Sequence, residues 1–289
     1  MDVITTRSLW RQALINERAQ GRTIGFVPTM GALHAGHRAL VEQAVRECDV
    51  AAVSIFVNPL QFGNAGDLAG YPRDLEGDCA LLEDAGAAYV FVPEVTEIYP
   101  DFPDHQATSI HVEGASLGFE GADRPGHFDG MATIVAMLFS LTGRAKAYFG
   151  EKDIQQLCVV QQMVADLAMD IEVIACPTVR HDDGVALSSR NARLSHTARQ
   201  RAAVIFRALS VGGKALESGA TRQEVEAVMA SCIAAEPEVS LSYAGVVETP
   251  SFAIPNELRP GQEYRLILAG ELDGVRLIDN IGAIAGRRP

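Results

Sequence analysis

Two histidines stand three residues apart where a predicted strand gives way to a predicted helix. Residues 27–41 read VPTMGALHAGHRALV, in which an Ala-Gly pair separates His34 from His37. Side chains at i and i+3 share one face of a helix, and a helix start offers unpaired N–H groups and a positive dipole end to an anion. The two imidazoles could therefore donate hydrogen bonds to a phosphate chain and stabilise the charge that builds on a departing pyrophosphate.

The spacing alone leaves alternatives open. Two partly exposed histidines that cap local groups fit it as well as phosphate binding does. A zinc pair is a third interpretation, although no nearby Cys, Asp or Glu completes the ligand set. The stretch from Gly31 to Gly36 resembles a Walker A loop, but His37-Arg38 stands where that loop requires Lys-Ser/Thr. No dinucleotide fingerprint follows the first strand, and neither G-x-S-x-G nor H-E-x-x-H occurs.

A second polar stretch, FGEKDIQQL at 149–157, follows a predicted strand and opens a predicted helix. Lys152 could neutralise phosphate charge, Asp153 could accept hydrogen bonds from ribose hydroxyls, and Gln155 and Gln156 could reach a polar substrate. An ordinary helix N-terminus with acidic side chains explains the same residues. For this stretch taken alone, that is the better explanation.

Three loop-like stretches complete the set of candidates. VALSSRNARLS at 185–195 offers two hydroxyls and Arg190 to a mobile phosphate clamp. NPLQFG at 58–63 and DRPGHF at 123–128 carry amide, guanidinium and imidazole groups that could orient a small carboxylate. Each of them, taken alone, is also explained as a polar loop.

Strands and helices alternate through the first part of the chain. The run 50–57 is continuously apolar, which is typical of a strand buried on both faces. The alternation favours a parallel sheet with helices on both faces, whose strand carboxyl ends are where ligands bind. The predicted strands are 23–28, 50–57, 88–93, one that ends at 147–150, and 171–175, and the predicted helices are one around 9–14, then 36–48, 73–86, 128–142 and 153–168.

After residue 178 the pattern changes. A long helical stretch is predicted at 196–218, and TRQE at 221–224 is a capping box that opens another helix. Three β-like segments follow near 239–249, 263–269 and 274–281. We therefore expect two domains, 1–178 and 179–289, of which the second is a smaller α+β domain.

The composition excludes several classes of protein. The chain has 289 residues, a formal net charge of −13 and no Lys/Arg cluster, which argues against nucleic acid as a partner. It has no basic start followed by an apolar run, and its longest apolar stretch, 131–141, is too short to span a bilayer. The five widely spaced cysteines are typical of free thiols in a reducing cytoplasm.

Six stretches together resemble one family. PTMGALHAGH, NPLQF, YPRD, RPGHF, FGEKDIQQL and LSSRN occur in the order and spacing of the pantoate–β-alanine ligases (pantothenate synthetases), and the resemblance runs from about residue 22 to RLIDNI at 276–281. His34 to His37 looks like the H-x-G-H signature of nucleotidyltransferases. Ser188 to Asn191 resembles the counterpart of the KMSKS loop of class I aminoacyl-tRNA synthetases. The resemblance implies an α/β fold, with a Rossmann-like N-terminal domain and a C-terminal lid, in a cytoplasmic homodimer.

The reaction that the resemblance implies is an AMP-forming acid–amine ligation in two steps. Pantoate's carboxylate attacks the α-phosphate of ATP, which gives pantoyl adenylate and pyrophosphate. The amine of β-alanine then attacks the acyl carbon, which gives pantothenate and AMP. Mg²⁺ is expected with ATP, whereas no tightly bound organic cofactor and no protein metal site are expected.

The resemblance also implies a role for each matching residue. His34, His37, Lys152 and Arg190 would be catalytic, with His37 as proton donor to pyrophosphate. Gln61 and Gln156 match the pantoate-binding glutamines, and Gln61 also matches a β-alanine contact. The implied ATP site comprises Pro28, Thr29, Met30, Gly31, Ala32, Leu33, His34, Ala35, Gly36, His37, Gly150, Glu151, Lys152, Asp153, Val179, Leu187, Ser188, Ser189 and Arg190.

Two positions depart from the family pattern, His181 where Glu is expected and Met131 where Val is expected. Neither is an implied catalytic position. Two rival functions remain at this point: another adenylyl-transferring enzyme of the superfamily, such as a cytidylyltransferase or a tRNA synthetase relative, and a non-catalytic nucleotide sensor. The paired glutamines argue against the first, and the intact histidines, Lys152 and Arg190 argue against the second.

Overall fold

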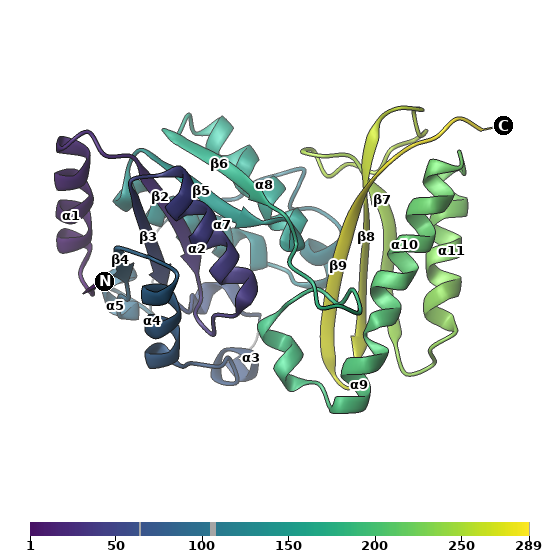
Figure 1. The fold of residues 1–289 in the computed structure, drawn as a ribbon, viewed down its shortest axis with the longest axis horizontal. Helices are drawn as coiled ribbons and strands as arrows, with labels where there is room; N and C mark the ends of the chain where they lie inside the picture. Colours follow the sequence, from purple (N-terminus) through teal and green to yellow (C-terminus); the bar gives the residue numbers. More distant parts are fainter. Residues whose placement is uncertain (64, 105–107, 289) are drawn as a thin grey trace. The chain divides into compact units, whose positions relative to one another are not determined.

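The structure, a computed structural model, describes residues 1–63, 65–104 and 108–288 (Figure 1). It divides into two compact units. The first unit comprises Met1–Glu151 and Gln155–Pro177, and the second comprises Lys152–Ile154 and Thr178–Pro289.

The first unit is built on a six-stranded sheet in which every strand pairing is parallel. Its order is β1-β4-β3-β2-β5-β6, so the chain winds outward in one direction from β2 and in the other from β5. The strands are β1 (Asp2–Ile4), β2 (Ile24–Thr29), β3 (Val50–Ile55), β4 (Tyr89–Phe91), β5 (Ala145–Gly150) and β6 (Ile171–Cys176). The predicted parallel sheet is confirmed, and the three-residue β1 was missed because it is too short to show a period.

Helices cover both faces of this sheet, as predicted. Neighbouring residues of β2 show it: Phe26 packs against Trp10 and Phe139, with ring centroids 6.1 and 6.3 Å apart. Val27 instead belongs to a buried cluster that includes Val41 and Leu82. One face is thus covered by α1 (Arg7–Ala19) and α7 (His127–Thr142), and the other by α2 (Ala35–Glu47) and α4 (Leu75–Asp84).

The remaining elements of the first unit are one long helix and several short ones. The long helix is α8 (Ile154–Asp166), which corresponds to the helix predicted at 153–168. The short elements, which the sequence analysis did not predict, are α3 (Ala65–Ala69), α5 (Val95–Ile98), α6 (Phe119–Asp123) and the 3₁₀ turns η1 (Pro59–Gln61) and η2 (Glu151–Asp153).

The second unit packs helices on a three-stranded antiparallel sheet of order β7-β8-β9 (Figure 1). The strands are β7 (Ser240–Val247), β8 (Glu263–Leu272) and β9 (Val275–Ile284), and the helices are α9 (His196–Arg201), α10 (Ala203–Glu217) and α11 (Arg222–Ala234), with the 3₁₀ turn η3 (Ser189–Arg193). The hairpin between β8 and β9 turns at Asp273-Gly274, both with positive φ, as a two-residue Asp-Gly turn requires. Leu209 and Met229 from the helices and Leu266 from the sheet are fully buried in one core.

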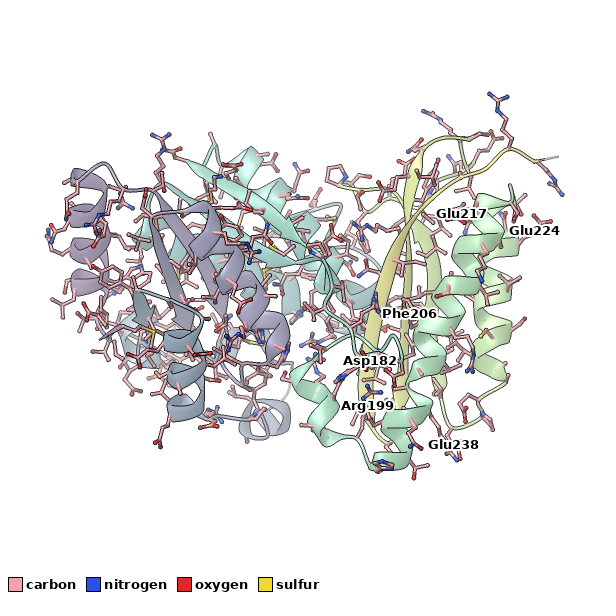
Figure 2. The ribbon with its side chains drawn as sticks, in the orientation of Figure 1. Asp182, Arg199, Phe206, Glu217, Glu224 and Glu238 are labelled. Carbon is pink, nitrogen blue, oxygen red and sulfur yellow. The ribbon has the colours of Figure 1, made fainter. Side chains whose placement is uncertain are left out.

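Two expectations about the helices of this unit had different outcomes. The capping box is confirmed: Thr221 accepts from the Glu224 N–H, and the Glu224 carboxylate accepts from the Thr221 N–H at the start of α11 (Figure 2). The helical stretch predicted at 196–218 is present with one break, because α9 ends at Arg201 and α10 begins at Ala203. Ala202 between them keeps a right-handed helical backbone, so the apolar period continues through the break.

All five cysteines carry free thiols, of which Cys158 and Cys176 are buried. Burial raises the pKa of the Cys176 thiol to about 12, which keeps it protonated and unreactive at neutral pH. Within the described ranges, no helix combines the length and the apolar character needed to cross a membrane.

Candidate functional site

The carboxyl ends of β2 and β5 lie side by side at the centre of the parallel sheet. The strand order reverses between these two strands, and such a switch point is where open α/β sheets bind ligands. The histidine turn follows β2, and the sequence FGEK runs over the end of β5. The fold therefore brings the first two candidate stretches to the ends of neighbouring strands.

The histidine turn is capped by its own imidazoles. His34 is the N-cap of α2, and its Nδ1 accepts the Gly36 N–H at 3.1 Å. His37 Nδ1 accepts the His34 N–H at 3.3 Å, and the two ring centroids are 4.1 Å apart. A neutral imidazole that accepts at Nδ1 carries its proton on Nε2. Local capping therefore accounts for the Nδ1 atoms, and in each neutral ring the proton is on Nε2.

Asp78 of α4 lies behind this turn and was not singled out from the sequence. Its side chain is buried, with 4% of the residue exposed. Asp78 Oδ2 accepts the Ala32 N–H at 2.9 Å, and Oδ1 accepts the Leu33 N–H at 2.6 Å. Burial raises the pKa of the Asp78 carboxyl, and the two N–H bonds oppose that rise. The signal that could have found it is a carboxylate four residues before Leu82, on the apolar face of the predicted helix.

The NPLQ segment is fastened to the start of α7. Asn58 Nδ2 donates to the Gly130 carbonyl at 3.0 Å, and Asn58 Oδ1 accepts from the Tyr99 hydroxyl at 3.0 Å. A Cβ on Gly130 would lie 2.2 Å from the Leu60 carbonyl oxygen, so only glycine allows this approach. These contacts hold Gln61 in place, and only 7% of this residue is exposed.

His127 of the RPGHF stretch supports the same segment with the opposite tautomer. Its Nδ1 lies 2.9 Å from the Gln61 carbonyl oxygen, which can only accept, so Nδ1 carries the proton. His127 Nε2 then accepts from Arg124 Nη1 at 3.1 Å. The RPGHF residues therefore position the backbone of Gln61, a role that sequence reasoning had left open.

The two neighbouring glutamines of α8 differ in their surroundings. Gln155 is buried, and its amide binds the start of α6 and the loop before it: Oε1 accepts the Glu120 N–H at 3.1 Å, and Nε2 donates to the Ala115 carbonyl at 3.0 Å. Gln155 therefore holds a loop, and the suggestion that it reaches a substrate is wrong. Gln156 is partly exposed, and it keeps its place as a candidate.

A pocket in the second unit gathers both cationic candidates and one of the hydroxyl candidates. Lys152, Ser188 and Arg190 line it together with Asn191, Phe206 and Asp279. Ser188 Oγ caps η3 by accepting the Arg190 N–H at 3.3 Å, and Asn191 Nδ2 donates to the Ala186 carbonyl at 3.0 Å. Lys152 Nζ lies 3.4 Å from a carboxylate oxygen of Asp153.

Two further candidates, Val179 and Leu187, lie side by side where the chain enters the loop at 188–191. The Leu187 N–H donates to the Val179 carbonyl at 3.0 Å, and Arg180 bridges to Ala186 in antiparallel fashion. Val179, Leu187, Ser188, Ser189 and Arg190 therefore belong to one hairpin-like segment of the second unit. Pro28 to His37, Gln61, Gly150, Glu151 and Gln156 belong to the first unit.

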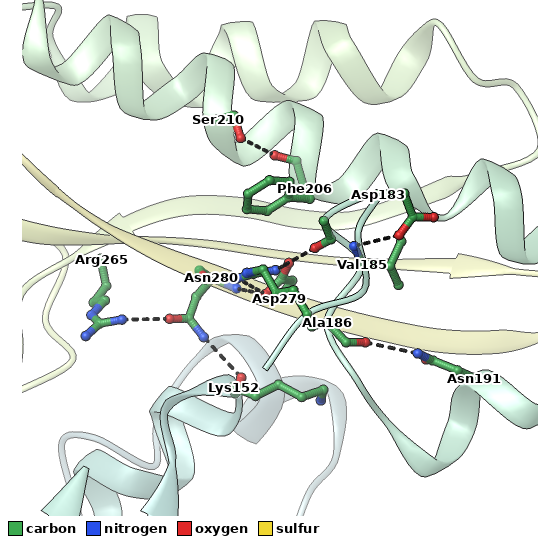
Figure 3. A network of polar contacts seen from close by, with 12 residues as sticks. Lys152, Asp183, Val185, Ala186, Asn191, Phe206, Ser210, Arg265, Asp279 and Asn280 are labelled. Carbon is green, nitrogen blue, oxygen red and sulfur yellow. Dashed lines mark hydrogen bonds and ion pairs between the residues drawn. The ribbon is translucent and has the colours of Figure 1, made fainter. Parts of the chain in front are cut away.

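A network of polar contacts includes two residues that line the pocket, Lys152 and Asp279 (Figure 3). Arg180 donates to both carboxylate oxygens of Asp279, at 2.6 and 2.9 Å, and its guanidinium lies 4.5 Å from the ring centroid of Phe206. Burial raises the pKa of the Asp279 carboxyl, while Arg180 acts in the opposite direction. Asn280 Nδ2 donates to the Lys152 carbonyl at 3.0 Å, and Asn280 Oδ1 accepts from Arg265 at 3.2 Å.

Within the described ranges, no three His, Cys, Asp or Glu side chains converge to hold a metal ion. The chemistry of the described candidates is hydrogen-bond donation and positive charge, which suits phosphate oxygens and carboxylates. Their donors are imidazole Nε2–H groups, Lys152, Arg190 and the hydroxyls of Ser188 and Ser189.

The chain is similar to known proteins over almost its whole length. The pantoate-beta-alanine ligase family profile matches residues 2–282. Pantothenate synthetase from Paracoccus denitrificans is 47% identical over 264 residues, with 91% of this chain and 92% of the relative covered. Pantothenate synthetase from Chloroflexus aurantiacus is 48% identical over 283 residues, with 97% of each chain covered.

Solved structures agree with these sequence matches. Pantothenate synthetase from Thermus thermophilus superposes with a TM-score of 0.89 at 46% identity, and the match covers 97% of this chain and 99% of that one. Pantoate-beta-alanine ligase from Francisella tularensis, solved with beta-gamma ATP and beta-alanine, superposes with a TM-score of 0.78 at 35% identity, with 97% of both chains covered. The chain belongs to the pantoate–β-alanine ligase family.

Proposed function

We propose that this protein condenses pantoate with β-alanine to pantothenate, with ATP as the activating substrate and AMP and pyrophosphate as products. The observation that carries the proposal is the histidine pair at the switch point between β2 and β5, whose Nδ1 atoms accept the Gly36 and His34 N–H groups. The family membership and the Francisella tularensis relative, solved with beta-gamma ATP and beta-alanine, support the choice of substrates.

In the first step, a pantoate carboxylate oxygen bonds to the α-phosphorus, and the bond from that phosphorus to the bridging oxygen breaks. The electron pair leaves with pyrophosphate. His34 and His37 donate hydrogen bonds from Nε2–H to phosphate oxygens, and this stabilisation grows as charge builds on the leaving group. A neutral Nε2–H serves as a hydrogen-bond donor, so we assign His37 this role in place of proton transfer to pyrophosphate.

In the second step, the amine of β-alanine bonds to the acyl carbon, the bond from that carbon to the AMP oxygen breaks, and the amine loses a proton. Gln61 and Gln156 are assigned to pantoate, and Gln61 also to β-alanine. Lys152, Asp153 and the segment 187–190 are assigned to nucleotide phosphates and ribose, and Val179 to adenine through its backbone. Adenylation is needed because a free carboxylate is a poor acyl donor, whereas AMP is a good leaving group.

Magnesium is proposed to arrive as part of the MgATP substrate. This ion commonly keeps several waters and binds through substrate phosphates with one or two carboxylates, and the described residues form no metal-holding group of three side chains. A resident protein metal is therefore not part of the proposal.

The proposed division of labour is between the two domains expected from the sequence. Residues 1–178 would bind pantoate and most of the nucleotide, and residues 179–289 would act as a C-terminal lid. A homodimer is proposed from the family resemblance alone. A cytoplasmic location is proposed because five free thiols suit a reducing compartment.

Two assays test the proposed function. We expect AMP release that requires ATP, pantoate and β-alanine together. We also expect pyrophosphate–ATP isotope exchange with pantoate alone, because the adenylate forms before the amine reacts. Exchange that needs β-alanine would contradict the two-step order. Pyrophosphate release that needs CTP, or AMP release that needs tRNA and not pantoate, would favour the rival transferases.

A further inference from the structure

The backbone that leads into the histidine turn is strained. Gly31 has φ of 82°, and the next residue, Ala32, has φ of 50°. A left-handed conformation is strained for a residue with a side chain. This conformation persists only if contacts around the turn hold it.

Asp78 supplies those contacts. Its two carboxylate oxygens accept the consecutive N–H groups of Ala32 and Leu33, at 2.9 and 2.6 Å. Hydrogen bonds to an ionised group are shorter and stronger than neutral ones. A Cβ added to Gly31 would lie 2.9 Å from Asp78 Oδ2, so glycine at this position lets the carboxylate come close to the turn.

The arrangement is unexpected beside a phosphate site. A buried carboxylate costs desolvation, and its negative charge repels phosphate. It also occupies two backbone N–H groups that would otherwise be available to an anion. In return, the carboxylate of Asp78 fixes the direction of the chain just before His34. The N–H of His34 donates in turn to His37 Nδ1 at 3.3 Å.

We propose that Asp78 is a positioning residue for adenylation, which fixes the turn at Ala32 and Leu33 so that His34 and His37 keep their shared cap and their Nε2–H tautomers. The inference rests on the proposed function for its kinetic consequence, but not for its structural one. It further implies that the N–H groups of residues 32 and 33 do not contact the nucleotide.

The test uses Asp78→Asn, Asp78→Ala and a matched control on the same helix. Asp78→Asn keeps the shape but replaces one acceptor by an NH₂ group, which faces a backbone N–H. The control is Asp74→Ala, because Asp74 also accepts a backbone N–H of α4, that of Gly77 at 3.0 Å, but caps the exposed start of the helix. Substitution at either site can lower the melting temperature, but only Asp78 of these two residues bonds to the histidine turn. The control therefore separates a loss of helix stability from a loss of positioning.

Pantoate-dependent pyrophosphate–ATP exchange gives the first readout. We expect kcat/KM for ATP to fall by at least about 10-fold in both Asp78 variants, since a small misplacement of catalytic groups is costly. The KM for pantoate and the kinetics of Asp74→Ala should stay unchanged. Wild-type kinetics in Asp78→Asn, or a KM for pantoate that rises about 10-fold in both Asp78 variants, would overturn the proposal.

Long-range ¹H–¹⁵N spectra of the histidine rings give a second readout that needs no substrate. Wild type and Asp74→Ala should show His34 and His37 protonated at Nε2, and the Asp78 variants should show mixed tautomers. Unchanged tautomers in Asp78→Ala would overturn the inference. A wild type without pantoate-dependent exchange would instead contradict the proposed function, while the spectra would still decide the role of Asp78.

Discussion

The histidine turn of the first unit and the serine-arginine loop of the second are held in place in different ways. Residues 31–34 are fixed directly, by a buried carboxylate on two N–H groups and by imidazoles that cap their own helix. The loop 188–191 has lighter local bonds, from Ser188 Oγ and the Asn191 amide, on half-buried residues. Its strong contacts lie one layer below, between Arg180 and Asp279.

The difference suggests two kinds of clamp. The histidine turn is preorganised, which suits groups that must meet charge as it develops in the transition state. The loop has a rigid base and an adaptable tip, which suits a segment that adjusts around a bound nucleotide. The histidine turn is the first clamp. The second clamp has the contact between Arg180 and Asp279 as its base and the loop 188–191 as its tip, and substitutions at these places should have different effects.

The largest effect is expected at the base of the second clamp. Arg180→Met removes the partner of Asp279, which is 5% exposed. Removal of one member of a buried ion pair costs about 3–5 kcal/mol, because the remaining charge is left uncompensated. Urea unfolding measures this loss. Arg180→Met combined with Asp279→Leu should recover most of the stability. A double variant as unstable as the single one would show that Arg180 acts mainly through its other contacts, the Phe206 ring and the carbonyls of Gly184 and Asn280.

The next effect is catalytic, and it tests the lysine that lines the pocket of the second clamp. Lys152→Ala should slow adenylation by about 10²-fold, as expected for loss of one preorganised donor. Melting should change little, because the Lys152 ammonium pairs with the adjacent and partly exposed Asp153. Lys146→Ala, in the preceding strand, is the control. Single-turnover adenylation with near-normal rate in Lys152→Ala would remove this lysine from the proposed mechanism.

These two predictions concern residues that the sequence revealed to different degrees. Lys152 was found because its motif matches a family, and Arg180 was not found, because its role depends on a strand 99 residues away. Asp78 was missed for a similar reason: its partners are backbone N–H groups about 45 residues earlier in the chain, which no side-chain pattern encodes. The helices and strands could be predicted because each is set by the local periodicity of apolar residues. The parallel sheet could be predicted because strands and helices alternate along the chain.

A third prediction tests whether the base of the second clamp holds Lys152. Asn280→Asp keeps an acceptor toward Arg265 but loses the amide that donates to the Lys152 carbonyl. An unsatisfied carbonyl costs about 1–3 kcal/mol, and the new carboxylate is itself buried beside Asp279. The free energy of unfolding in urea should therefore fall by at least that amount. Adenylation should slow by less than in Lys152→Ala, because the ammonium remains present but less well placed. An unchanged adenylation rate with reduced stability would limit Asn280 to a structural role.

The smallest effect is expected from an exposed ion pair near the loop, which contrasts with the buried one beneath it. Arg199 of α9 (Figure 2) donates to both oxygens of Asp183, at 2.8 and 3.1 Å, and 42% of the Asp183 side chain is exposed. The bond from Arg199 lowers the pKa of the Asp183 carboxyl. A carboxyl with a lowered pKa in the folded state adds stability that is present above its unfolded pKa of about 3.9 and is lost as pH falls through the folded value.

Asp183→Asn isolates that ion pair, because Asn keeps the acceptor for the Val185 N–H. At pH 7 the variant should lose at most about 1 kcal/mol, since solvent screens an exposed pair. The difference from wild type should shrink as pH falls below about 4, where the unfolded carboxyl takes up its proton, and also at high salt. Urea unfolding at several pH values measures it. If the loss at pH 7 approached that of Arg180→Met, the distinction between a rigid base and an adaptable surface in this unit would be wrong, because surface contacts would then hold the loop as firmly as buried ones.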